Sequence, residues 1–165
     1  RCGLGEMAKY HFLGGDDLAD LAFDQQVARC VEIKADIVAA DERDAGRRAI
    51  LNYGHTLGHA IETTGHYDLR HGEAVAIGLV YAAELSQALE RIDSDRVAEH
   101  RKIVDGYGLP ISLPEGAQAD DLMAAMARDK KAVDGLTFAL DGPTGIEVVA
   151  NIDPGLVRDT LDAVR

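Results

Sequence analysis

Residues 72–92 read GEAVAIGLVYAAELSQALERI, and apolar residues occupy nearly every side of the helix that this stretch favours. A helix that is apolar all round lies buried, because each of its faces needs apolar neighbours. The stretch therefore predicts a central helix around which the other elements pack, in a mainly α-helical domain.

The segments on both sides of this helix are also expected to be helical. Gly14 and Gly15 end a first helical segment, and Asp16 and Asp17 offer caps for a long second one. The polar sequence GHYDLRHG indicates a loop before the central helix. The other expected helices are residues 4–13, 18–42, 49–64, 94–105 and 119–128.

The two-residue period of a β-strand appears only near the end of the chain. Residues 136–140 and 146–152 flank the turn DGPTG and predict one short hairpin, after which Asp153 and Pro154 begin a last helix. We therefore expect a mainly α, multihelical fold with one hairpin, and treat residues 1–165 as one domain. So small a sheet is not suited to hold a dinucleotide.

The composition argues against several classes of function. The 165 residues include 29 acids against 17 lysines and arginines, and this net charge of -12 disfavours binding to nucleic acid or to an anionic membrane. No apolar run approaches the roughly 20 residues of a membrane span. Cys2 and Cys30 are too few for a disulfide framework, so we expect a reducing cytoplasm. Because the chain begins with Arg1 in helix-like sequence, we expect a C-terminal piece of a longer protein.

Four of the six histidines lie between positions 55 and 71. On a helix, His55 and His59 project from one face because they are four residues apart, and His71 opens the next helix. Two imidazoles, one carboxylate and an open position make up a catalytic zinc site, although such a histidine pair alone is more often a surface feature. The glutamate of H-E-x-x-H is missing, which argues against a zinc peptidase.

The glycines beside these histidines strengthen the hypothesis of a site. Gly54 and Gly58 lie inside an expected helix, where each glycine costs about 1 kcal/mol relative to alanine. Such costs suggest that a backbone or a ligand approaches closely. The carboxylate partner stays open between Glu6, Glu62 and Glu73, the last of which also suits the first turn of its helix.

Basic residues are scarce in this chain, and several stand in apolar or motif-like surroundings. Lys34 lies next to the apolar face of its helix, where a lysine can also simply extend its tip to solvent. The alternative is a set of cations that holds an anionic substrate in an acidic protein. The cations concerned are Lys9, Lys34, Arg47, Arg48, Arg70, Lys130 and Lys131.

Taken together, these motifs resemble the C-terminal domain of the 3-dehydroquinate synthases. The central ones are LNYGHTLGHAIE (51–62) and HGEAVAIGL (71–79), preceded by KADIVAADERDAGRR (34–48). GLGEMAKYHFL (3–13) and ARDKK (127–131) match the same family in the right order. The resemblance thus covers nearly the whole chain.

This resemblance implies the identity of the site residues. A single zinc ion would be held by Glu6, His55 and His71. His59 would face the substrate and assist proton or phosphate chemistry without binding the metal. The implied substrate contacts are Lys9, Lys34, Arg48, Asn52 and one lysine of the DKK motif, either Lys130 or Lys131.

The resemblance also implies the reaction, in which 3-deoxy-D-arabino-heptulosonate 7-phosphate becomes 3-dehydroquinate and phosphate in the shikimate pathway. The expected cofactors are NAD+ and Zn2+, with Co2+ as a substitute, and the partner is this anionic sugar phosphate. NAD+ would rest mostly on an N-terminal α/β domain, which this sequence lacks, so we expect the isolated chain to be inactive. We expect the full-length enzyme to be a cytoplasmic homodimer.

Other functions remain as alternatives to this one. Sugar phosphate cyclases that make 2-deoxy-scyllo-inosose or valiolone share the zinc motif, although Arg48 and the DKK motif favour a dehydroquinate synthase. Metal-dependent glycerol or alcohol dehydrogenases share the architecture and would stop at oxidation. A non-catalytic helical metal-binding module is the alternative of another class.

Overall fold

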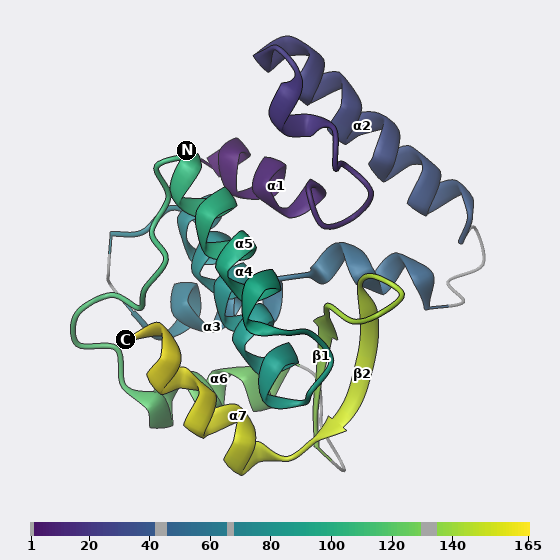
Figure 1. Ribbon diagram of the computed structural model, residues 1–165. Helices are drawn as coiled ribbons and strands as arrows, with labels where there is room; N and C mark the ends of the chain where they lie inside the picture. Colours follow the sequence, from purple (N-terminus) through teal and green to yellow (C-terminus); the bar gives the residue numbers. More distant parts are fainter. Residues whose placement is uncertain (1, 42–45, 66–67, 130–134) are drawn as a thin grey trace.

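The computed structural model describes residues 2–41, 46–65, 68–129 and 135–165. Helix α4 (His71–Ala88) lies at the centre of this part of the chain, as Figure 1 shows. Residues 72–83 of α4 are all buried, which confirms the predicted central helix. The helices with the most contacts to α4 are α1 (Cys2–Tyr10), α3 (His55–Thr64) and α5 (Ser94–Gly106).

The C-terminal elements complete the core beneath α4. Helix α6 (Ala119–Asp129) packs against α3, and α7 (Pro154–Thr160) packs against α4. Strands β1 (Leu136–Leu140) and β2 (Glu147–Ile152) pair antiparallel, which confirms the predicted hairpin. The Asp153 side chain accepts a hydrogen bond from the amide of Leu156 at 3.0 Å, so the predicted cap of the last helix is also present.

The long helix expected over residues 18–42 is interrupted. A short 3-10 turn (Leu18–Asp20) comes first, and α2 (Phe23–Ala39) begins only after an extended Ala22. The Gln25 side chain caps this start by accepting the Ala22 amide hydrogen at 3.1 Å. Asp17, which we expected to cap the helix, instead pairs with Arg29 at 3.3 Å. The first helix likewise ends at Tyr10, three residues before the expected position 13.

The helix expected over residues 49–64 is also two elements. A 3-10 helix (Arg47–Asn52) ends before Tyr53, and α3 begins at His55. Between them Gly54 adopts a positive φ of 77°, which favours glycine and breaks the helix. A Cβ atom at Gly54 would lie 2.9 Å from the carbonyl oxygen of Val75, so this glycine also lets the chain pass close to α4.

Two glycine-to-glycine contacts hold the helices of the site together. A Cβ atom at Gly5 would overlap the carbonyl oxygen of Gly72, and one at Gly78 would overlap that of Gly54. Each contact includes a glycine that adjoins a candidate ligand in the sequence. Glu6 follows Gly5, His71 precedes Gly72, and His55 follows Gly54. The close backbone approach that Gly54 predicted is thus present, and the unpredicted contact of Gly5 with Gly72 brings the Glu6 segment to His71.

Within the described ranges, no helix combines the length and the apolar character needed to cross a lipid bilayer.

Candidate metal and substrate site

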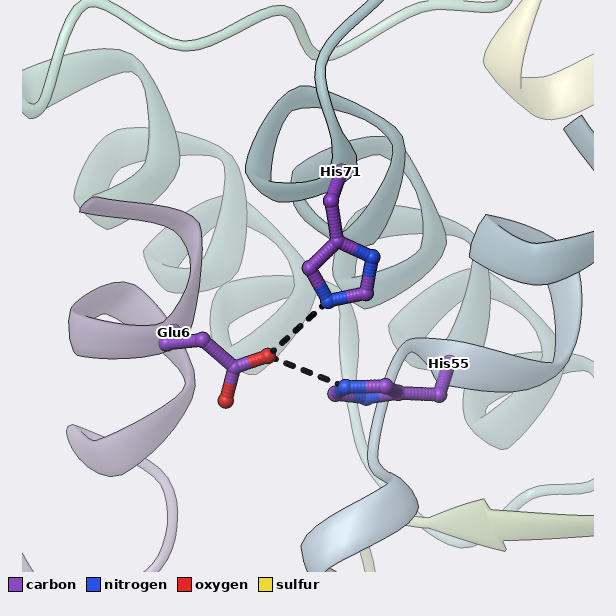
Figure 2. Close-up of side chains that lie close together, drawn as sticks. All are labelled: Glu6, His55 and His71. Carbon is purple, nitrogen blue, oxygen red and sulfur yellow. Dashed lines mark ion pairs between the residues drawn. The ribbon is translucent and has the colours of Figure 1, made fainter. Parts of the chain in front are cut away.

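Three ligand-type side chains from three helices converge at one point. Glu6 extends from α1, His55 from the first residue of α3 and His71 from the first residue of α4 (Figure 2). The Oε1 atom of Glu6 lies 3.0 Å from Nε2 of His55 and 3.5 Å from Nε2 of His71. These are the residues that the family resemblance implies as metal ligands, and the structure places them together.

The second nitrogen of each ring has its own hydrogen-bond acceptor. The Nδ1 atom of His55 lies 3.0 Å from the carbonyl oxygen of Tyr53, and Nδ1 of His71 lies 3.0 Å from Oε2 of Glu62. A carbonyl or carboxylate oxygen only accepts, so each Nδ1 carries the hydrogen. Each Nε2 is then left with its lone pair directed toward Glu6, as a metal ligand requires.

The geometry fits a zinc-type ion. Ligands about 2.1 Å from a tetrahedral zinc ion lie about 3.4 Å from one another. The distances of 3.0 and 3.5 Å between Glu6 and the two histidines are close to that value. One carboxylate and two imidazoles also leave a coordination position open for substrate, as in catalytic zinc sites.

Glu62 and Glu73, the other two carboxylates that the sequence offered as metal ligands, have different contacts. Glu73 is buried and its Oε2 atom accepts the backbone hydrogen of Arg70 at 2.9 Å, so it caps the start of α4. Glu62 contacts His71 from the side opposite Glu6. His59 is exposed, with its ring centre 5.5 Å from that of His55 and 6.2 Å from that of His71.

A buried lysine holds the second oxygen of the candidate ligand carboxylate. The Nζ atom of Lys9 donates to Oε2 of Glu6 at 2.6 Å and to the carbonyl oxygen of Leu51 at 2.8 Å. Burial alone would raise the pKa of Glu6, but the contact with His55 and the hydrogen bond and charge of Lys9 hold that pKa far below its usual value. Burial lowers the pKa of Lys9, and the charge of Glu6 opposes that shift. Glu6 therefore stays ionised, with Oε1 directed at the histidines.

An open cavity of about 740 Å³ adjoins the three convergent side chains. All four substrate contacts that the resemblance implies within the described residues lie in its wall, namely Lys9, Lys34, Arg48 and Asn52. His59 lies beside the cavity and is absent from its wall, and Lys130 and Lys131 fall outside the described residues. The cavity thus gathers three cations in a chain whose net charge is -12.

Sequence reasoning missed two residues of this region. Tyr10 lines the cavity, and burial raises the pKa of its hydroxyl to about 12. Tyr53 supplies the carbonyl oxygen that orients His55. Its position directly before Gly54 and His55 was a possible signal, although a tyrosine there also suits a core.

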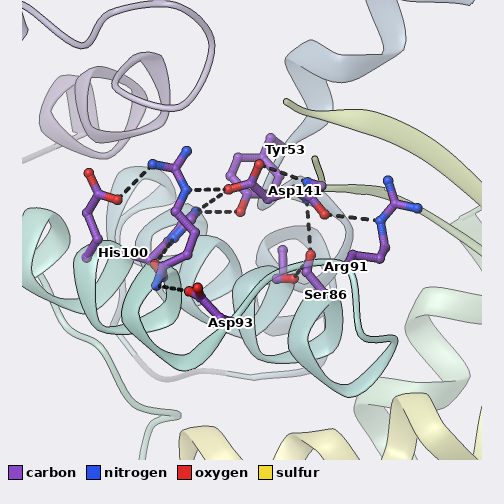
Figure 3. A network of polar contacts seen from close by, with 10 residues as sticks. Tyr53, Ser86, Arg91, Asp93, His100 and Asp141 are labelled. Atoms are coloured by element: carbon purple, nitrogen blue, oxygen red, sulfur yellow. Dashed lines mark hydrogen bonds and ion pairs between the residues drawn. The ribbon is translucent and has the colours of Figure 1, made fainter. Parts of the chain in front are cut away.

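A buried polar network anchors the segment that precedes His55 (Figure 3). His100 is fully buried, donates from Nδ1 to the carbonyl oxygen of Arg96 at 2.8 Å, and accepts the hydroxyl hydrogen of Tyr53 at 2.7 Å. Asp141 accepts from Nε of Arg96 at 2.7 Å, and the His100 ring stacks on Phe12 with centres 3.7 Å apart. The network therefore fixes Tyr53, whose carbonyl oxygen orients His55.

The fold matches about half of the chain in each of two solved enzyme structures. A 2-deoxy-scyllo-inosose synthase complexed with carbaglucose-6-phosphate, NAD+ and Co2+ matches with a TM-score of 0.84 over 99% of this chain and 51% of its own, at 21% identity. A 2-epi-5-epi-valiolone synthase from Streptomyces hygroscopicus subsp. jinggangensis 5008, with NAD+ and Zn2+ bound, matches with a TM-score of 0.72 over 98% of this chain and 46% of its own, at 17% identity. At such identities the likeness shows the shared fold.

Sequence comparison identifies the family of this chain. The family described as 3-dehydroquinate synthase C-terminal matches residues 3–132, and the chain belongs to it. This confirms the family and the fold class expected from the motifs.

The relatives are about twice as long as this chain. A 3-dehydroquinate synthase of Nitrobacter hamburgensis is 46% identical over 186 residues, which cover 98% of this chain and 49% of that protein. A protein of Amycolatopsis mediterranei, provisionally named aminodehydroquinate synthase, is 51% identical over 160 residues, which cover 97% of this chain and 46% of that protein. This chain therefore spans about half the length of the curated relatives that it matches.

Proposed function

We propose that this chain forms the metal-binding and substrate-binding half of a 3-dehydroquinate synthase. Such an enzyme converts 3-deoxy-D-arabino-heptulosonate 7-phosphate to 3-dehydroquinate and phosphate. The observation that carries the proposal is the convergence of Glu6, His55 and His71 at the edge of a cavity lined by cations. Relatives named 3-dehydroquinate synthase and neighbours solved with NAD+ and Co2+ or Zn2+ support it.

The residues of the site divide by role. Glu6, His55 and His71 would hold a Zn2+ or Co2+ ion, which would supply Lewis-acid chemistry at a substrate hydroxyl. Lys34 and Arg48 attract the phosphate and the carboxylate of the substrate, and an arginine suits such groups because it donates two parallel hydrogen bonds.

The remaining residues position these groups or move protons. Lys9 keeps Glu6 ionised and directed at the histidines, and Asn52 adds a polar contact for substrate hydroxyls at the cavity wall. His59, beside the metal ligands and exposed, transfers a proton to or from the substrate. One lysine of the DKK motif, Lys130 or Lys131, completes the cationic set.

The second half of the enzyme would bind the nucleotide. Because the relatives are about twice as long, we place the NAD+ site mainly on an N-terminal domain, so that the reaction takes place between the two halves. The complete protein would act as a cytoplasmic homodimer.

A second candidate function differs only in the substrate. The relative provisionally named aminodehydroquinate synthase aligns over 160 residues, whereas the Nitrobacter protein aligns over 186, more than the 165 residues of this chain. The Nitrobacter relative therefore has extra residues within the matched region. The relative named aminodehydroquinate synthase is also the more similar of the two, at 51% against 46% identity, and this similarity favours a substrate in which an amino group replaces a hydroxyl.

One experiment tests both candidates. The full-length enzyme is incubated with NAD+, Zn2+ and either the hydroxyl substrate or its amino counterpart, and products are identified by mass spectrometry. We expect 3-dehydroquinate and one equivalent of phosphate from the hydroxyl substrate. Turnover of the amino substrate alone would instead establish the second candidate, and an oxidised product that still carries phosphate would contradict both.

A further inference from the structure

Glu62 approaches the candidate metal site from outside. It lies on α3 seven residues after His55, and its Oε2 atom is 3.0 Å from Nδ1 of His71 on the next helix. It is not needed as a ligand, because Glu6 already supplies a carboxylate oxygen between the Nε2 atoms of both histidines. Its role in the site is therefore open.

Glu62 also belongs to a second group of ligand-type residues, with His59 and His71. In that group Glu62 faces Nδ1 of His71, while Nε2 of the same ring faces Glu6. A neutral imidazole has one lone pair for a metal and one hydrogen. A ring whose Nε2 binds the ion at Glu6 therefore donates its Nδ1 hydrogen to Glu62.

The orientation of the His71 ring depends on a hydrogen bond from Nδ1 to a side chain more than that of the His55 ring does. The side chain of His71 is 40% exposed and that of His55 is 13% exposed, so packing restrains the His71 ring less. The His55 ring is further held by the carbonyl oxygen of Tyr53, which belongs to the backbone and cannot be lost by substitution. Glu62 is the side chain that provides the equivalent acceptor for His71.

We propose that Glu62 is a positioning residue, which accepts the Nδ1 hydrogen of His71 and thereby holds Nε2 of that ring toward the metal. A carboxylate behind a ligand histidine fixes the ring orientation and makes it a better donor, and loss of such a partner typically costs 10- to 100-fold in metal affinity. The inference rests on the proposed metal site at Glu6, His55 and His71.

A matched pair of substitutions isolates the hydrogen bond. Glu62→Gln keeps an oxygen that can accept from His71, whereas Glu62→Met has a similar length and suits a helix but offers no comparable acceptor. Glu32→Ala, which removes an exposed glutamate of α2, controls for the change in net charge. The metal-free 165-residue chains are titrated with Zn2+ against a competing chelator, the absorption spectrum of bound Co2+ is recorded, and thermal unfolding checks that each chain folds.

We expect wild type and Glu32→Ala to bind one Zn2+ with the same dissociation constant. Glu62→Met should raise that constant 10- to 100-fold and alter the Co2+ spectrum, while Glu62→Gln should raise it no more than about threefold. The inference is wrong if Glu62→Met and Glu62→Gln bind zinc equally well. It is also wrong if the wild type binds two ions and Glu62→Met loses one, because Glu62 would then be a ligand. Failure of the wild type to bind zinc would instead contradict the proposed metal site itself.

Discussion

Single residues decide how this acidic chain would hold the anionic substrate that we propose. Lys9 is committed to Glu6 and to the carbonyl oxygen of Leu51, so its main effect is on the charge and direction of that carboxylate. Lys34 and Arg48 are exposed at the cavity wall, where an arriving phosphate or carboxylate can meet them. Substrate affinity should therefore depend more on Arg48 than on Lys9.

Replacement of Arg48 by alanine in the full-length enzyme should raise KM more than tenfold. A bidentate, charge-assisted contact with the substrate is lost, and hydrogen bonds to charged groups contribute about 1.5–3 kcal/mol. Arg48→Lys, which keeps the charge without the paired donors, should fall between wild type and Arg48→Ala. If steady-state kinetics show KM and kcat of Arg48→Ala within about twofold of wild type, Arg48 does not contact the substrate.

The buried His100 should make stability depend on pH. Burial is the largest influence on this ring and lowers its pKa to about 4, whereas an unfolded histidine titrates near 6.5. Between these two pKa values the unfolded chain binds the proton and the folded chain does not. The stability that the neutral His100 ring contributes is therefore fully present above pH 6.5, and it is lost as the pH falls through this window. The contribution lost between pH 7 and pH 5 is about 2 kcal/mol.

Urea unfolding of the metal-free chain measures this effect. Burial also lowers the pKa of His11, so wild type is compared with His100→Gln, in which only the His100 contribution is absent. The difference in unfolding free energy between the two proteins should narrow by about 2 kcal/mol from pH 7 to pH 5. A constant difference would show that His100 titrates normally in the folded chain.

At the scale of helices and loops, the sequence predicted the elements that follow from the local spacing of apolar residues. The apolar residues 72–92 indicated a buried central helix, and α4 is that helix. The breaks at Ala22 and Gly54 were missed, because neither segment contains a proline and both have continuous apolar spacing. The break at Gly54 accompanies its close approach to Val75 of α4, a contact between distant segments that a local pattern does not contain.

The packing of α1 on α4 can be tested with two glycines of the same helix. An added methyl group at Gly5 would overlap the carbonyl oxygen of Gly72, whereas one at Gly3 meets no atom within 4 Å. Gly5→Ala should lower the unfolding free energy by about 1–3 kcal/mol, as overpacking does. Gly3→Ala should leave the unfolding free energy unchanged or raise it by up to about 1 kcal/mol through helix propensity.

Gly5→Ala should also weaken zinc binding, because it moves Glu6 away from His71. Urea unfolding and a zinc titration of both variants check the prediction. Equal stability of the Gly3→Ala and Gly5→Ala chains would mean that α1 and α4 are not in close backbone contact.

For the whole molecule, the site is assembled from segments far apart in the chain. Glu6 meets histidines 49 and 65 positions later, since α1 lies against α4. Residue types and spacing therefore predicted a site among His55, His59 and His71 but left open which two bind the metal and which carboxylate joins them. Only the resemblance to a known family selected His55, His71 and Glu6. Substrate contacts on the partly described DKK motif stay a prediction.

Helix α2 carries exposed apolar side chains, which a second half of the proposed enzyme could cover. Phe23, Val27 and Val31 recur every four residues and are 64%, 44% and 63% exposed. The isolated chain, supplied with Zn2+, NAD+ and the heptulosonate phosphate, should release no phosphate, because we place the nucleotide site mainly on the second half of the proposed enzyme. Phosphate release above that of a His55→Ala control would show that these 165 residues suffice for catalysis.

The zinc content of two histidine variants tests the central claim most directly. His55 is proposed as a ligand and His59 as a proton-transfer residue beside it, so the two differ in what their loss removes. Elemental analysis of purified full-length enzyme should find close to one zinc per chain in wild type and in His59→Ala, with turnover of His59→Ala reduced by about 10²–10⁴-fold. His55→Ala should lose most of its zinc together with its activity. Zinc retained in His55→Ala and lost in His59→Ala would reverse the two roles, and zinc retained in both would remove the metal site from this helix.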